Sequence, residues 1–358
     1  MKKVYIIAEA GVNHNGSLDI AKKMICVAAK AGVDAIKFQT FKAENLVSKT
    51  APKAQYQMQM TDVHESQYEM LKKLEIDITA HLELMKCCEE NHIEFLSTPF
   101  DSDSLALLVN DCKLPRIKIP SGEITNAPFL LQIAQTGKPV ILSTGMSTLS
   151  EIEIALSTLA FGYLNRKDVP SLDGFLSVYA SYEGQEVLQE KVTLLHCTTE
   201  YPAPFNEVNL KCMDTMNQVF DLPVGYSDHT EGICIPIAAV ARGAVMIEKH
   251  FTLDRTLMGP DHKASLEPQE LKEMVQGIRQ IEKAIGNGIK APSVSEMKNK
   301  VIVRKSLIAK APIYKGEIFT ADNLTVKRPG DGISPIYYWS KIGEKAKSDY
   351  EEDEVIRE

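Results

Sequence analysis

The chain has 358 residues, which is long for one average domain and suits a barrel-sized domain followed by a small one. With 44% hydrophobic and 25% charged residues, its composition excludes a disordered or fibrous chain, and no run of 18 apolar residues is available for a membrane-spanning helix. The formal net charge of −8 argues against nucleic acid as a partner, and seven cysteines without C-x-x-C spacing predict reduced thiols in a cytoplasmic protein.

Short apolar runs alternate with helical patterns from residue 4 to about residue 285. The runs predict strands at 4–9, 34–39, 94–99, 116–121, 139–145, 192–198, 223–229 and 245–251. Their near-continuous apolar character is typical of parallel strands that are covered on both faces. Helical spacing is found at 18–31, 79–91, 103–112, 149–160 and 269–285. This alternation predicts an α/β fold, a (β/α)8 barrel over residues 1–285, with a doubly wound sheet as the alternative.

Two further regions interrupt or follow this pattern. Residues 163–190 are polar, and we interpret them as a surface insert. Gly286-Asn287-Gly288 and Ala291-Pro292-Ser293 predict a linker over 286–300. The remaining residues, 301–358, predict a compact domain with short β-like segments at 301–309 and 318–326.

Polar residues end or follow every predicted strand. The loops at the carboxyl ends of the strands of a (β/α)8 barrel surround one cavity, so we expect these side chains to converge. Lys37 and Lys118, together with Thr98, Ser121 and Ser143, predict a cradle for a phosphate or carboxylate. Ammonium groups neutralise such an anion, and hydroxyls satisfy its remaining lone pairs.

Two histidines end neighbouring predicted strands, His229 and His250. Two imidazoles, with water and substrate oxygens as further ligands, suit a catalytic divalent ion, and the sequence leaves open whether Asp228 or His14 adds a ligand. Three carboxylates, those of Glu9, Glu123 and Asp261, are placed for acid–base chemistry or for binding sugar hydroxyls.

Ordered segments along nearly the whole chain resemble the bacterial sialic acid synthase family. They include AEAGVNHNG (8–16), KFQTF (37–41), KIPSGEI (118–124), LLHCTTEYPAPF (194–205), GYSDHT (225–230), EKHFTLD (248–254) and KRPGDGIS (327–334). The resemblance implies a (β/α)8 barrel followed by a small antifreeze-like (SAF) domain. It also implies that phosphoenolpyruvate condenses with open-chain N-acetylmannosamine to give N-acetylneuraminate, a nine-carbon 2-keto acid, with C–O cleavage and release of phosphate.

The resemblance also implies roles for individual residues. Phosphoenolpyruvate would be held by Lys37, Thr98, Lys118, Ser121, Ser143, Thr199 and Ser227, and the sugar by Gln39, Tyr201, Asp261 and Arg328. Glu9, Glu123 and Lys118 would be catalytic, with Glu123 activating water, and His229 and His250 would bind Mn2+, with Mg2+ or Co2+ as alternatives. Thr199 departs from the asparagine of several family members. The resemblance further implies a homodimer in which the C-terminal domain is swapped and Arg328 closes the cavity of the partner.

The acceptor sugar remains open between two candidates. The segments HCTTEYPAPFNEVNL (196–210) and GPDHKASLEPQELK (259–272) also resemble N,N′-diacetyllegionaminate synthases. Their acceptor, 2,4-diacetamido-2,4,6-trideoxymannose, carries a 4-acetamido group in place of a hydroxyl. The sequence favours N-acetylmannosamine slightly. More remote alternatives are a Schiff-base aldolase that uses Lys37 or Lys118, and an ice- or sugar-binding module without catalytic activity.

Overall fold

The structure, a computed structural model, describes residues 3–53 and 65–357. The chain divides into two compact units, residues 1–286 and 287–358, and each is considered by itself.

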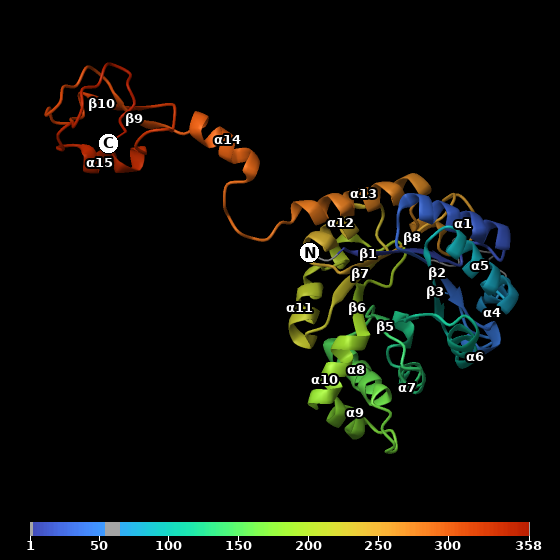
Figure 1. The fold of residues 1–358 in the computed structure, drawn as a ribbon. Helices are drawn as coiled ribbons and strands as arrows, with labels where there is room; N and C mark the ends of the chain where they lie inside the picture. Colours follow the sequence, from blue (N-terminus) through green and yellow to red (C-terminus); the bar gives the residue numbers. More distant parts are fainter. Residues whose placement is uncertain (1–2, 54–64, 358) are drawn as a thin grey trace. The chain divides into compact units, whose positions relative to one another are not determined.

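In the described part of the first unit, eight parallel strands form one sheet (Figure 1). They are β1 Tyr5–Gly11, β2 Ala35–Thr40, β3 Glu94–Pro99, β4 Ile117–Ile119, β5 Val140–Ser143, β6 Val192–Cys197, β7 Val224–Asp228 and β8 Met246–His250. The hydrogen-bonded order is β3-β2-β1-β8-β7-β6-β5-β4, and β4 packs beside β3, so the strands close into a ring. The predicted (β/α)8 barrel is confirmed.

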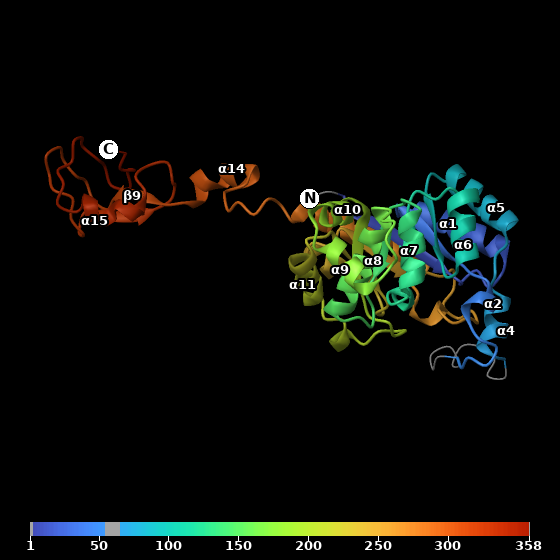
Figure 2. The same cartoon turned by 90° about the horizontal axis from the view of Figure 1, so that it is seen from below.

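Most of the helices surround this ring on the outside, whereas α2 and α4 contribute residues to the cavity at the carboxyl ends of the strands (Figures 1 and 2). The helices are α1 Leu18–Ala31, α2 Ala43–Leu46, α4 Gln67–Lys72, α5 Ile78–Glu90, α6 Ser102–Ala106, α7 Ala127–Gln135, α8 Leu149–Tyr163, α9 Leu172–Tyr179, α10 Tyr182–Lys191, α11 Lys211–Phe220, α12 Cys234–Ala241 and α13 Pro268–Ala284. Several begin at the capping residues that such helices prefer. Ser17 accepts from the backbone N–H of Ile20 at the start of α1, and Thr148 forms a capping box with Glu151 at the start of α8.

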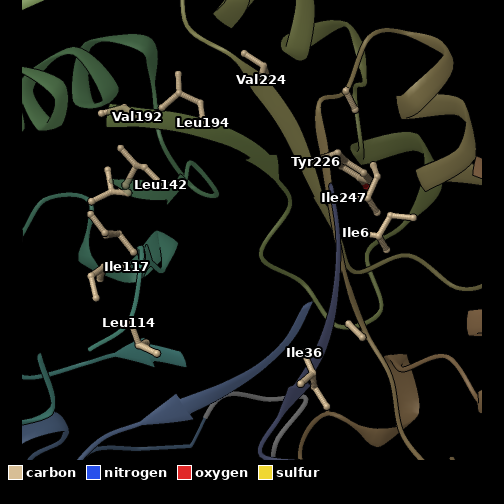
Figure 3. Packing of buried hydrophobic residues seen from close by; sticks show 14 of the residues in the cluster. Ile6, Ile36, Leu114, Ile117, Leu142, Val192, Leu194, Val224, Tyr226 and Ile247 are labelled. Carbon is tan, nitrogen blue, oxygen red and sulfur yellow. The ribbon is translucent and has the colours of Figure 1, made fainter. Parts of the chain in front are cut away.

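Alternation along each strand separates the helix-facing core from the barrel interior. Outward residues such as Ile6, Ile36, Leu142 and Ile247 pack with the helices in the main hydrophobic core (Figure 3). The inward residues of one layer are apolar and fill the barrel: Ile7, Ala35, Leu96, Ile141, Leu195 and Met246. Two residues further along most of these strands, the next inward residue is polar, and the functional site begins there.

Three local expectations differ from the structure. Residues 163–190 do not form a mere surface insert, because α9 and α10 pack beside α8 and bury Phe175, Val178 and Leu188. A few apolar residues at helical spacing suffice for this, although the segment as a whole is polar. The helix expected at 103–112 divides into α6 and a π-helical stretch, Leu107–Asp111. The strand expected at 116–121 is shorter, and Ser121–Glu123 forms a 3-10 turn.

The second unit contains α14 Val294–Val303, β9 Ser306–Ala309, β10 Leu324–Lys327 and α15 Tyr338–Lys341. Helix α14 occupies the end of the predicted linker and the start of the β-like segment expected at 301–309. Strands β9 and β10 pair antiparallel over a small separate core that includes Leu307, Phe319 and Ile356. This unit is the small β-containing domain expected after the barrel. In neither described stretch is any helix long and apolar enough to cross a membrane.

Candidate active site

A cavity of about 310 Å3 lies at the carboxyl ends of the strands. Thirteen of the residues predicted from the sequence line it: Glu9, Lys37, Gln39, Thr98, Lys118, Ser121, Ser143, Thr199, Tyr201, Ser227, His229, His250 and Asp261. Most of them occupy inward positions one or two layers above the apolar filling of the barrel. The expected convergence at the strand ends is therefore present.

Lys37 is buried and lies between two carboxylates. Its Nζ contacts Glu9, lies 3.6 Å from Oε2 of Glu248, and donates to Oγ1 of Thr98 at 2.9 Å. Parallel pairing places Glu9 directly beside Lys37 in the register of β1 and β2. The ammonium group is thereby held rigidly, with its charge compensated inside the barrel.

Lys118 occupies the other side of Glu248. Its Nζ donates to Oγ of Ser143 at 2.6 Å and lies 3.5 Å from Oε1 of Glu248. The same carboxylate oxygen accepts from Oγ of Ser227 at 2.8 Å. Glu248 thus joins the two lysines, and the site contains equal numbers of buried lysines and buried glutamates.

The two glutamates differ in their affinity for protons. Burial raises the pKa of Glu9 to about 7, although Lys37 opposes this shift. Burial alone would raise the pKa of Glu248 too, but Lys118 and Lys37 lower it to about 2. Environments that separate the pKa values of two neighbouring carboxyls are typical of acid–base sites. Glu248 is therefore a fixed negative charge near neutral pH, and Glu9 is able to exchange a proton.

A hydroxyl corner, consisting of Ser121 and Thr199, lines the same cavity next to Gly145. Oγ of Ser121 accepts from the backbone N–H of Gly145 at 2.9 Å. Oγ1 of Thr199 is buried and has no hydrogen-bond partner in residues 3–53 and 65–357. A buried hydroxyl without a partner is costly, so this corner is suited to a polar ligand atom.

The imidazoles of His229 and His250 face each other, with ring centroids 5.5 Å apart. Nδ1 of His229 donates to the carbonyl oxygen of Thr198 at 2.7 Å, which leaves a lone pair on Nε2. Nδ1 of His250 is buried and has no hydrogen-bond partner in the described residues. Burial, reinforced by the nearby His229, holds the pKa of His250 well below its usual range. The ring of Tyr201 lies 4.0 Å from that of His229.

These features fit a divalent metal ion bound through the two imidazoles. In the described part of the chain, no group of three or more His, Cys, Asp or Glu side chains could hold a metal ion. Asp228 is not a third ligand, because its carboxylate accepts from Lys249 at 2.7 Å and from Tyr226 at 2.9 Å. His14 lies outside the cavity lining, and its Nδ1 accepts from the backbone of Gly16. Water and substrate oxygens would complete the coordination.

Asp261 lies close to His250, with its Oδ2 3.9 Å from Nδ1 of the histidine, beside a bulge in β1. The register of β1 against β2 shifts between Glu9 and Gly11, and Gly11 has a φ of +51°. A Cβ at Gly11 would lie 3.3 Å from Oε1 of Glu9 and 3.4 Å from both Oδ2 of Asp261 and Cε1 of His250. Glycine therefore permits the close approach of these three side chains. Burial raises the pKa of Asp261 to about 6.

Two predicted residues are not among those that line this cavity in the barrel unit. Glu123 is in the 3-10 turn after β4, does not line the cavity, and accepts from Nδ2 of Asn126 at 2.7 Å. The turn interrupts the alternation of the strand, so the inward periodicity of β4 does not extend to Glu123. Arg328 is an exposed residue of the second unit.

Glu248 is a site residue that the sequence-based assignments missed. Its neighbours Lys249 and His250 belong to the same polar strand end, where the sequence analysis assigned a role to His250 alone. Because His250 faces inward and strand residues alternate, residue 248 faces inward as well. The two-residue periodicity of the strand was therefore the signal by which the sequence could have identified Glu248.

Comparison with known proteins relates the chain to characterised sequences and structures. Residues 24–290 match the NeuB family, and residues 304–358 match the SAF domain. The chain is 55% identical, over all of both chains, to the N,N′-diacetyllegionaminic acid synthase of Campylobacter jejuni. It is 44% identical to the enzyme of the same name from Legionella pneumophila, over 95% of this chain and 90% of that one.

A solved structure shows the same similarity in three dimensions. The N-acetylneuraminic acid (sialic acid) synthetase of Leptospira borgpetersenii, in complex with citrate, superimposes with a TM-score of 0.66. The two are 34% identical, and the match covers 83% of this chain and 90% of that one. The chain belongs to the NeuB family.

Proposed function

We propose that the protein is an N,N′-diacetyllegionaminate synthase, which condenses phosphoenolpyruvate with 2,4-diacetamido-2,4,6-trideoxymannose. The observation that carries this acceptor is the 55% identity, over the full length, to a relative named for that product. The relative named as a sialic acid synthetase is 34% identical. This reverses the slight preference for N-acetylmannosamine drawn from the sequence, and that sugar becomes the second candidate acceptor.

We assign the lysines and the hydroxyl corner to phosphoenolpyruvate. Lys118, Ser121, Ser143 and Thr199 surround one part of the cavity with donors, and Lys37 adds a second positive charge. A bound phosphate or carboxylate would take over contacts that Glu9 and Glu248 make with the lysines. Donors that are already oriented stabilise developing charge without reorganising during the reaction.

We assign His229 and His250 to a divalent ion, with Mn2+ as the first candidate and Mg2+ or Co2+ as alternatives. When bound, the ion supplies a Lewis acid for the aldehyde oxygen of the open-chain sugar. The support for this assignment is the partnerless Nδ1 of His250 and the fixed tautomer of His229. Gln39, Tyr201 and Asp261 line the same cavity and are assigned to the sugar.

The proposed reaction forms one carbon–carbon bond and breaks one carbon–oxygen bond. C3 of phosphoenolpyruvate attacks the aldehyde carbon, and the aldehyde oxygen gains a proton to become a hydroxyl. Water adds to C2 and releases one proton. The C2–O bond to phosphate then breaks, phosphate leaves with the bridging oxygen, and the new C2 hydroxyl gives its proton to the leaving phosphate as it becomes the keto group. Glu9 accepts the proton that the attacking water releases, because its pKa of about 7 suits proton exchange. This assignment replaces Glu123, which does not line the cavity. Lys118 balances the negative charge of the leaving phosphate.

Two further parts of the proposal rest on the family resemblance. We propose a homodimer in which Arg328 of one chain acts on the acceptor bound by the other. We also propose a cytoplasmic location, which agrees with the seven cysteines that are free in the structure. A Schiff-base aldolase has less support, since Lys37 and Lys118 are each close to a carboxylate rather than isolated in an apolar pocket.

The test is to supply the Mn2+-loaded enzyme with phosphoenolpyruvate and either acceptor, and to measure phosphate release. We expect turnover with both sugars and a higher kcat/KM for the trideoxy sugar. A higher kcat/KM for N-acetylmannosamine would refute the proposed acceptor, and no turnover with either would refute the synthase. Borohydride in the presence of pyruvate should leave the enzyme unmodified, whereas a covalent adduct would indicate a Schiff-base aldolase.

A further inference from the structure

The cavity has a second surface that the proposed reaction leaves unexplained. Besides its charged and polar residues, it is lined by an apolar wall, consisting of Val12, Leu46, Val47, Met70, Leu71 and Phe100. None of these six side chains carries a nitrogen or oxygen atom. The apolar wall therefore offers no hydrogen bond to the phosphate, the carboxylate or the aldehyde of the two substrates.

The apolar wall comes from the segments that follow the first three strands. Val12 follows β1, Leu46 ends α2, Met70 and Leu71 belong to α4, and Phe100 follows β3. Helices α2 and α4 pack against each other, as Figure 2 shows. Val12 and Met70 are buried in a small core of their own.

Part of the apolar wall is still accessible. Leu46, Val47 and Leu71 are half-buried, so they retain apolar surface that a ligand would cover. The small core accounts for the buried members, but it does not account for apolar side chains that remain exposed at the cavity. Covering such surface favours a ligand with matching apolar groups.

The two candidate acceptors differ at the end of the sugar that is remote from the aldehyde. N-acetylmannosamine carries hydroxyls at C4 and C6, whereas the trideoxy sugar carries an acetamido group at C4 and a methyl group at C6. A hydroxyl against the apolar wall would give up water without gaining a partner. A methyl group there would leave water and cover Leu46, Val47 or Leu71.

We infer that the apolar wall receives the C6 methyl and the 4-acetamido methyl of the acceptor, and that it sets the preference over N-acetylmannosamine. The inference rests on the proposed function and adds to it the residues that determine which acceptor sugar the enzyme prefers. In apolar pockets, one methyl group or one extra hydroxyl changes kcat/KM by about 10- to 200-fold. The contribution of the apolar wall is expected to lie in that range.

The test replaces half-buried members of the apolar wall in the full-length, Mn2+-loaded enzyme. For Leu46→Asn and Leu71→Asn, we expect the ratio of kcat/KM for the trideoxy sugar to that for N-acetylmannosamine to fall about tenfold or more. A tenfold change corresponds to about 1.4 kcal/mol. The KM for phosphoenolpyruvate should stay unchanged. Val47→Thr, which adds a hydroxyl at almost constant volume, should lower the ratio in the same direction and is the variant least able to disturb folding.

A matched control is Leu107→Asn, a half-buried leucine that packs on the main core and does not line the cavity. It should leave the acceptor ratio unchanged. If the apolar-wall variants retain the wild-type ratio, or lose both acceptors equally, the inference is overturned while the proposed function stands. If the wild-type enzyme turns over neither sugar, the proposed function itself fails, and the inference fails with it.

Discussion

The hydroxyl corner can be perturbed by a single methyl group. Gly145 is buried, and its φ is not positive, so alanine can adopt the same backbone conformation. A Cβ there would overlap Oγ1 of Thr199 and lie 2.8 Å from Oγ of Ser121. Both are ends of side chains that can rotate. Gly145→Ala should therefore keep the fold and displace the hydroxyls that we assign to phosphoenolpyruvate.

The size of the effect follows from the hydrogen bonds lost. A hydrogen bond to a charged group contributes about 1.5–3 kcal/mol. Loss of one such bond to the substrate therefore lowers kcat/KM for phosphoenolpyruvate by about ten- to 150-fold, at about 1.4 kcal/mol for each tenfold change. The KM for the acceptor sugar should change little. The three atoms nearest to the added methyl group belong to Thr199 and Ser121, and none belongs to the assigned sugar residues Gln39 and Asp261.

The assay is steady-state phosphate release, with phosphoenolpyruvate and acceptor varied in turn. Gly122→Ala is the matched control, since Gly122 lines the same cavity but a Cβ there meets nothing within 4 Å. It should behave like the wild type. An unchanged kcat/KM for phosphoenolpyruvate in Gly145→Ala, or an equal loss in Gly122→Ala, would refute the assignment of the hydroxyl corner.

Three other outcomes test separate parts of the structure and the proposal. Chelation should abolish turnover, Mn2+ should restore it, and His250→Ala should stay folded but inactive; activity in metal-free enzyme would exclude the metal assignment. Gly225→Ala should destabilise the barrel by about 1–3 kcal/mol, because the new Cβ would lie 2.5 Å from the carbonyl oxygen of Met246. Urea unfolding should show a lower midpoint, and an unchanged midpoint would contradict this packing. Arg328→Ala and Lys118→Ala should each be nearly inactive, yet regain activity when mixed; heterodimers without activity would refute the proposed swap.

Several features of this protein could be derived from the order of its residues. The eight apolar runs predicted the barrel, because buried parallel strands require apolar residues on both faces. The polar residues at the strand ends predicted one site, because a closed parallel barrel directs all eight carboxyl ends to the same side. Lys37, Lys118, His229 and His250 were identified in this way, and all of them line the cavity.

Other features depended on the direction of individual side chains. Glu248 and Lys249 are adjacent in sequence, but the first faces the cavity and the second pairs with Asp228 on the other side of the strand. Glu123 follows the end of β4 by only a few residues, yet it belongs to a 3-10 turn and does not line the cavity. The geometry of such a turn depends on local packing, which the hydrophobic periodicity of the sequence does not predict.

The sequence by itself thus determined the barrel, the small C-terminal domain and the chemical types of most site residues, because hydrophobic periodicity and strand ends are local properties of the chain. Only the tertiary structure decided which charges meet. The pKa values of Glu9 and Glu248 diverge because burial acts on both, whereas the two lysines compensate one more strongly than the other. The apolar wall likewise joins segments from three strand ends, and its common surface exists only once those segments are packed together.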